Sequence, residues 1–225
     1  MVKKGLSMQM FSALAAIVTA TVIICLCAAT CSGGKLDFKA TYYFVCYRMT
    51  DNAISADAIS KTVSSYGGAG YILPHGGNYY VTLSCYYKSD EADSVCAKLK
   101  ERDLECSVLK IETKQYRLQG SNAKKNEQLY LGNLKTLNSL SALAYECANG
   151  LDTGSLSQSK AKQLLTSITD SLNGLLKNNP ANCFTQSLQS AVEECKNVSG
   201  GFLLSKNMRY IQIALADRII NAELN

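Results

Sequence analysis

The chain has a single histidine, His75, and no Cys-x-x-Cys pair among its ten cysteines. Zinc sites and thioredoxin-like sites use such pairs, and a catalytic triad needs a histidine beside its nucleophile. His75 stands instead in a Gly-rich joint, His75-Gly76-Gly77-Asn78, which is typical of a solvated turn. The sequence also lacks a Gly-x-Ser-x-Gly motif, and the glycines around Gly70 do not have the spacing of a dinucleotide fingerprint. We therefore expect a protein that is not an enzyme and that holds no metal or cofactor.

A concentrated basic segment is lacking as well. The formal net charge is +5, but the lysines and arginines are spread along the chain without a strongly basic face or run. Proteins that bind DNA or RNA carry such a face to neutralise phosphates. We therefore expect no nucleic-acid partner.

What the chain does have is a pattern written twice within residues 42–111. Each copy reads as an apolar strand, an amphipathic helix and a second apolar strand. When one copy is moved by about 36 positions, Val45 falls on Val81, Ile72 on Val108 and Leu73 on Leu109. Because the pattern occurs only twice, it predicts a closed βαββαβ domain and not a solenoid.

Two helices with one apolar stripe each cover only one face of a four-stranded sheet, so we expect a two-layer domain with an open sheet face. We assign five residues to the sheet face that contacts the helices: Phe44, Cys46, Val81, Leu83 and Cys85. Alternation then places a tyrosine-rich set of candidate ligand-binding residues on the open face: Tyr43, Val45, Tyr47, Tyr80, Thr82, Ser84 and Tyr86. Tyrosine rings suit stacking on sugar rings. Alternatively, tyrosine serves here as a good strand residue, and the C-terminal half of the chain packs on this face.

Three stretches carry a family resemblance: Tyr42-Tyr43-Phe44-Val45-Cys46-Tyr47, Tyr79-Tyr80-Val81-Thr82-Leu83 and Asp90-Glu91-Ala92. On these, residues 42–111 resemble a SPOR domain, the sporulation-related repeat of bacterial cell-envelope proteins. The resemblance implies a ferredoxin-like fold that binds peptidoglycan through its open sheet face, favouring glycan strands stripped of their peptides. The family's Gln-x-Gly-Ser/Ala-Phe pattern reads Val45, Tyr47, Arg48 and Met49 here, so an apolar residue stands where the family has a polar one facing the ligand.

The N-terminal segment predicts export from the cytoplasm. Lys3 and Lys4 precede an apolar stretch, residues 11–29, that is close to the ~20 residues needed to cross a bilayer. This charge pattern predicts a single-pass anchor in the bacterial cell membrane with a cytoplasmic N-terminus. A cleaved secretory signal ending near Ala28-Ala29-Thr30, and a lipoprotein signal ending at Cys31, are the alternatives.

The C-terminal part predicts a helical module at residues 123–225, after a polar linker at 112–122. Apolar stripes at helical spacing predict about four helices, with stops at Asn149-Gly150, Asn178-Asn179-Pro180 and Gly200-Gly201. Short loops predict an up-down bundle. Cys147 and Cys195 then lie at the same end of the first and third helices and are candidates for a disulfide. If these two helices are diagonal in the bundle, the cysteines are too far apart and remain two buried thiols.

The expected fold class is therefore α+β. It consists of a transmembrane helix within residues 1–34, a linker at 35–41, the two-layer βαββαβ domain at 42–111 and the helical bundle. The first functional hypothesis is a membrane-anchored, non-enzymatic envelope protein that binds peptidoglycan, linked to division or sporulation, with its bundle free to contact other envelope proteins. The second is an interaction protein whose sheet face is covered by its own helices or a partner, without glycan binding. An accessory wall hydrolase comes third, because the catalytic set is absent.

Overall fold

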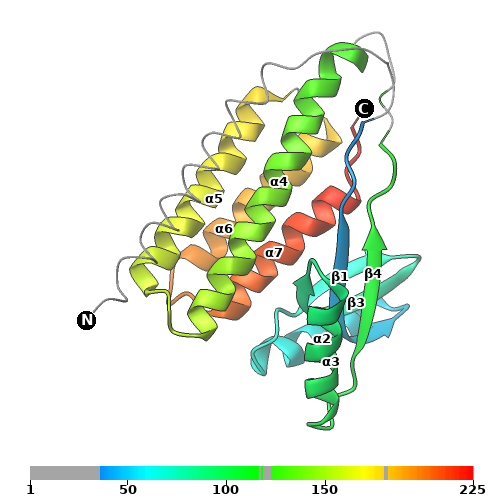
Figure 1. Ribbon diagram of the computed structural model, residues 1–225, viewed down its shortest axis with the longest axis vertical. Helices are drawn as coiled ribbons and strands as arrows, with labels where there is room; N and C mark the ends of the chain where they lie inside the picture. Colours follow the sequence, from blue (N-terminus) through cyan, green and yellow to red (C-terminus); the bar gives the residue numbers. More distant parts are fainter. Residues whose placement is uncertain (1–35, 117, 119–122, 180–181, 225) are drawn as a thin grey trace.

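The computed structural model describes residues 36–116, 118, 123–179 and 182–224. Its elements in chain order are β1 (Thr41–Thr50), α2 (Ala53–Ser65), β2 (Tyr71–His75), β3 (Asn78–Tyr86), α3 (Ser89–Lys100), β4 (Ser107–Glu112), α4 (Ala123–Asp152), α5 (Gln158–Asn178), α6 (Cys183–Ser199) and α7 (Ser205–Ile220). The first six follow the βαββαβ order that the duplicated pattern predicts, and four long helices follow them (Figure 1).

The four strands form one antiparallel sheet in the order β2-β3-β1-β4. The pairing of β1 with β3 is interrupted twice. Val45 pairs with Ser84 and Cys46 with Thr82, so Leu83 is an extra residue on β3. One step further, Arg48 pairs with Val81, which leaves Tyr47 as an extra residue on β1. Each β-bulge shifts the alternation of side chains by one position, so residues before and after it exchange faces.

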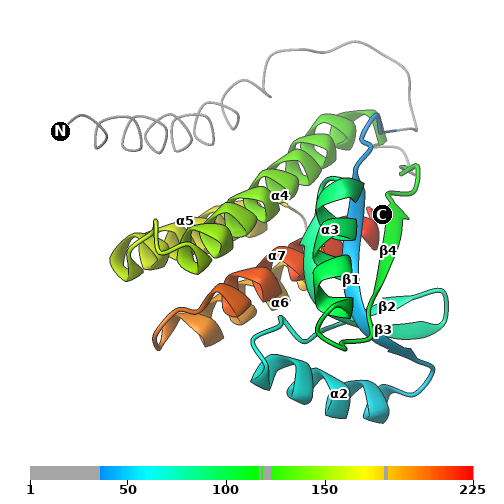
Figure 2. The same cartoon turned by 60° about the horizontal axis from the view of Figure 1, so that its bottom comes forward.

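Both faces of this sheet are covered, which corrects the predicted two-layer domain with an open face. On one face, Tyr42, Phe44, Cys46, Leu73 and Cys85 belong to the same hydrophobic core as the long helices. Helix α7 packs on β2 and β3 from this side, and its red end lies behind β1 in Figure 2, with α3 in front. Helix α4 reaches this face through Asn138, whose Oδ1 accepts a hydrogen bond from Tyr42. The molecule therefore has three layers: the pair α2 and α3, the sheet, and the bundle.

Helix α7 is the element that makes this arrangement possible. Its run from Ile211 to Ala216 is buried at every position. A helix that is apolar all round is a buried helix, whereas a helix on the outside of a bundle needs only one apolar stripe. Helix α7 packs on α4 and α6 with one side and on the sheet with the other.

Helices α2 and α3 pack on the opposite face of the sheet as two separate clusters. Ala92 and Cys96 of α3 lie over Val45 and Tyr86. Ala56 and Val63 of α2 lie over Val81. The start of α2 is fixed by Asn52, whose side chain accepts hydrogen bonds from the backbone N–H groups of Ile54 and Ser55 at 2.8 and 3.2 Å. Because α2 and α3 contact the sheet through these two separate clusters, they leave a gap between them over the middle of the sheet.

In the bundle, α4 and α6 are diagonal. Each of them packs against α5 and against α7, and these are their main contacts. Cys147 of α4 and Cys195 of α6 are accordingly both free, buried thiols, and the bridge predicted between them is not present. The diagonal placement is the physical reason, since a disulfide needs Cα atoms within about 7 Å.

The transmembrane prediction also needs correction. Residues 11–29 lie outside the described residues. Within the described part of the chain, no helix has both the length and the apolar character needed to cross a bilayer. The fold class is therefore corrected: the described residues form a mixed α+β fold with six helices and a four-stranded antiparallel sheet, and they give no support to the predicted single-pass membrane localisation.

Candidate functional site

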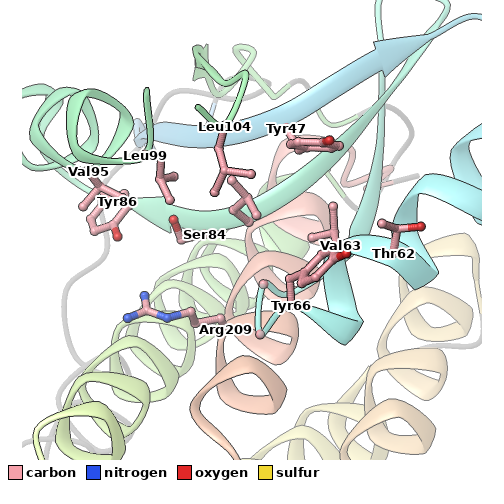
Figure 3. A pocket seen from close by; sticks show the side chains of 13 residues that line it. Tyr47, Thr62, Val63, Tyr66, Ser84, Tyr86, Val95, Leu99, Leu104 and Arg209 are labelled. Carbon is pink, nitrogen blue, oxygen red and sulfur yellow. The ribbon is translucent and has the colours of Figure 1, made fainter. Parts of the chain in front are cut away.

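A cleft of about 280 Å³ opens between α2 and α3 above the middle of the sheet (Figure 3). Its apolar lining comes from both helices, from the sheet and from the loop that precedes β4. We call it the tyrosine cleft. It is lined by Tyr47, Thr62, Val63, Tyr66, Gly67, Gly68, Leu83, Ser84, Tyr86, Val95, Leu99, Leu104 and Arg209.

The bulge on β3 forms the floor of the tyrosine cleft. Because Leu83 is an extra residue there, Leu83 and its neighbour Ser84 both face α2 and α3 instead of pointing to opposite sides. The backbone of Gly68 closes over this floor. A Cβ atom at Gly68 would lie 2.7 Å from both Leu83 Cδ2 and Val63 Cγ1, so only glycine fits without displacing these side chains.

Three tyrosine rings border the cleft, each from a different element. Tyr66 follows the end of α2 and is 85% exposed, Tyr47 on β1 is half-buried, and Tyr86 at the end of β3 is buried. Figure 3 shows Tyr47 and Tyr66 toward one end of the cleft and Tyr86 toward the other. Tyr86 is held by an edge-on contact with Tyr145 of α4, with ring centroids 5.9 Å apart. The result is an apolar groove with flat aromatic faces accessible from solvent.

Arg209 of α7 lines the edge of the cleft, and its guanidinium is directed away from the other lining side chains in Figure 3. Its Nη2 donates to Asn149 Oδ1 at 3.2 Å and to Asp152 Oδ2 at 2.7 Å, both on α4. Its Nη1 is buried and has no hydrogen-bond partner within the described residues. A buried donor without a partner is costly, and the two hydrogen bonds of Nη2 to α4 hold the guanidinium in this position.

The structure divides the seven candidate residues between two faces. Five of them, Tyr43, Val45, Tyr47, Ser84 and Tyr86, face α2 and α3. Tyr80 packs against the core of the bundle, and Thr82 is fully buried with its hydroxyl donating to Tyr71 O at 2.9 Å. The prediction that all seven share an open face is therefore wrong, because the helices of the repeat cover the face that we assigned to solvent and the bulges interrupt the alternation.

Only Tyr47, Ser84 and Tyr86 of that set meet in the tyrosine cleft. Sequence reasoning missed Tyr66 and Arg209. For Tyr66 the sequence carries only a partial signal, because Gly67-Gly68 marks the end of the helix but does not show that the Tyr66 ring stays exposed. Arg209 carries none, since its approach to the cleft depends on α7 packing against the sheet.

A buried charge network lies on the other side of the sheet. Tyr71 donates its hydroxyl to Asp217 Oδ2 at 2.6 Å, and Arg218 Nη2 donates to Glu194 Oε1 at 2.9 Å. Burial raises the pKa of both carboxyls, Asp217 and Glu194, above their ordinary values. Their hydrogen bonds connect β2 with α7 and α6 with α7. We therefore interpret these four residues as structural.

Metal ligands do not gather in the part of the chain that the structure describes, where no group of three or more His, Cys, Asp or Glu side chains is placed to hold an ion. His75 pairs with Asn78 at the exposed turn between β2 and β3.

Comparisons with known proteins find similarity to one solved structure. No family model matches the chain, and no curated protein matches it. One solved structure does: the peptidoglycan-binding domain of the B. subtilis cell wall lytic enzyme CwlC. It is 21% identical over 37% of this chain and 98% of that domain, with a TM-score of 0.27. Agreement at this level does not establish a shared function.

Proposed function

We propose that the protein binds the glycan strands of peptidoglycan without cleaving them, and that the tyrosine cleft is the binding site. The observation that carries this proposal is the composition of the cleft: accessible tyrosine faces, an apolar floor, and polar side chains of Thr62, Ser84 and Arg209 in its lining. Sugar rings present apolar C–H faces that stack on aromatic rings, and their hydroxyl and acetamido oxygens accept hydrogen bonds.

Each part of the cleft has a role in this proposal. Tyr66 and Tyr47 supply stacking faces for one sugar ring. The hydroxyls of Ser84 and Thr62 give polar contacts, and Arg209 supplies a positive charge at the edge of the cleft. The cleft volume of about 280 Å³ is near the lower end of the ~300–1,000 Å³ range of ligand pockets. It would hold a short stretch of the strand, while the rest runs over the surface.

The SPOR-like pattern of residues 42–111 supports peptidoglycan as the ligand but not the family's location for it. In the family, the open sheet face holds the glycan, and in this chain α4 and α7 cover that face. The proposal therefore moves the binding site to the opposite side of the sheet, where Tyr47 and Tyr66 of the first repeat copy reach solvent.

A pelleting assay with purified peptidoglycan sacculi and the full chain tests the proposal. We expect retention of the wild-type chain at moderate salt. Tyr66→Ala should weaken binding about fivefold, because a stacked ring is worth about 1 kcal/mol. Phe202→Ala is the matched control, since Phe202 is an aromatic residue that is 71% exposed and lies outside the cleft lining.

Two results would overturn the proposal: a wild-type chain that stays in the supernatant, or a Tyr66→Ala chain that pellets as well as the wild type. The first result favours the second candidate function, an interaction protein without glycan binding. A specific observation supports that candidate, because the sheet face is covered by the chain's own helices. Its partner surface would include the exposed apolar side chains of Ile54 and Met49.

A further inference from the structure

Two cysteines approach each other closely beside the tyrosine cleft. Cys96 Sγ on α3 lies 2.8 Å from Cys106 Sγ, at the residue before β4. Both side chains are buried, at 5% and 8% exposure, and Cys106 Sγ also lies 3.2 Å from Cys96 O. Both cysteines are reduced in the structure.

We propose that Cys96 and Cys106 are a disulfide modification site that closes the loop between α3 and β4. The separation of the two sulfur atoms is less than 1 Å longer than a disulfide bond of about 2.05 Å. The two sulfur atoms therefore already lie next to each other, and forming the bond requires them to approach by less than 1 Å. The loop that the bond closes contains the exposed residues of the turn at Asp103, whose φ is 58°.

The oxidant in this proposal is a small-molecule disulfide such as oxidised glutathione. One protein thiol loses its proton, and the thiolate attacks the small disulfide, which forms a mixed disulfide and releases one small thiol. The second protein thiolate then attacks the protein sulfur of the mixed disulfide and releases the other small thiol. Two protein thiols and one small disulfide thus give one protein disulfide and two small thiols, so the protein loses two electrons and the oxidant gains them.

The bond would fix one wall of the tyrosine cleft. Leu99 and Leu104 line the cleft and lie between the two cysteines in sequence. In the reduced chain, the segment that carries Leu99 and Leu104 is fixed at its two ends only by the burial of the two thiols. The disulfide would link these two ends covalently. This inference does not depend on what the cleft binds.

Burial raises the pKa of the Cys106 thiol to about 11, so the Cys106 thiol is rarely ionised at neutral pH in the folded chain. Oxidation is therefore best carried out during refolding, when both thiols are exposed. The full chain is refolded from denaturant in a buffer of oxidised and reduced glutathione, and a second sample is refolded with reduced glutathione alone.

Tryptic peptide mass spectrometry without reduction reads out the result, because the sequence separates the two cysteines. Cleavage after Lys98 and Arg102 puts Cys96 in the peptide of residues 89–98 and Cys106 in the peptide of residues 103–110. We expect these two peptides to be linked in the oxidised sample only. The oxidised chain should unfold about 5 °C higher than the reduced one, as expected for a bridge over a short loop.

Cys96→Ser should abolish both the linked peptide and the thermal shift, while Cys147→Ser, a substitution at a buried thiol elsewhere, should leave both unchanged. Free thiols at Cys96 and Cys106 in the oxidised wild type would overturn the proposal. So would pairing of either cysteine with the exposed Cys183 or with any other cysteine. Because the main readout is the wild-type chain, the outcome does not depend on whether a variant folds.

Discussion

At the scale of residues, three tyrosines in or next to the sheet, Tyr42, Tyr71 and Tyr87, anchor it to the bundle. Tyr42 donates its hydroxyl to Asn138 Oδ1 at 2.8 Å, and Tyr87 donates to Ser141 Oγ at 2.9 Å, both on α4. Tyr71 reaches Asp217 on α7. A buried tyrosine needs a partner for its hydroxyl, and here each partner lies at least fifty residues away in sequence. The richness of the repeat in tyrosine therefore has two explanations, since some rings anchor the bundle and others line the cleft.

Arg218 gives the sharpest stability prediction at this scale. Its side chain is 9% exposed and donates hydrogen bonds to Glu194 Oε1, Ser187 O and Ala214 O. Arg218→Ala leaves a mostly buried carboxylate without its cation, so we expect a loss of about 3 kcal/mol in the free energy of unfolding, measured with urea.

Lys196→Ala is the control for Arg218→Ala. Lys196 pairs with Glu193 on the same helix, α6, but both side chains are 56% exposed. An exposed pair contributes about 0–1 kcal/mol, so this variant should unfold close to the wild type. Equal losses in the two variants would show that the network around Arg218 does not stabilise the fold as described.

At the scale of elements, the sequence predicts most of the secondary structure and little of its packing. The offset of Val45 onto Val81 and of Leu73 onto Leu109 locates all four strands, because period-2 apolar patterns depend only on neighbouring residues. The bulges at Leu83 and Tyr47 are not readable in this way, since they depend on how β1 pairs with β3. Helix α7 did carry a signal, because every residue from Ile211 to Ala216 except Gln212 is apolar, which favours a helix covered on two sides.

The connection between α2 and β2 offers a matched pair of glycines. Gly70 has φ +65°, and a Cβ there would lie 2.7 Å from Ser60 O; Gly67 has φ +91° with no atom within 4 Å. Gly67→Ala adds backbone strain alone, for which we expect about 1 kcal/mol. Gly70→Ala adds strain and a backbone clash, for which we expect about 3 kcal/mol. Thermal unfolding of both variants checks this order, and an equal loss would contradict it.

At the scale of the whole molecule, one hydrophobic core runs from the sheet into the bundle. It contains Phe44 and Leu73 of the sheet together with Leu137 of α4, Leu165 of α5 and Leu215 of α7. Residues 42–111 and 123–225 can be separated on sequence grounds, but the described fold buries the sheet face of one against the helices of the other. Separated, the sheet would expose this apolar face to water.

We therefore expect the sheet and the bundle to unfold together. Pulsed hydrogen exchange along a urea series, resolved by peptide, should give the same midpoint for β1 as for α5. A midpoint for β1 well below that for α5 would mean that the sheet opens while the bundle stays folded, which the shared core argues against.

Glycan binding in the tyrosine cleft is the central claim, and chemical-shift mapping by NMR tests it most directly. The full chain, labelled with ¹⁵N, is titrated with soluble glycan strands from which the peptides have been removed. We expect the largest shifts at the amides of Gly67, Gly68 and Leu104, which border the cleft, and small shifts on the outer face of α5. An unchanged spectrum at saturating glycan, or shifts confined to surfaces away from the cleft, would contradict the claim.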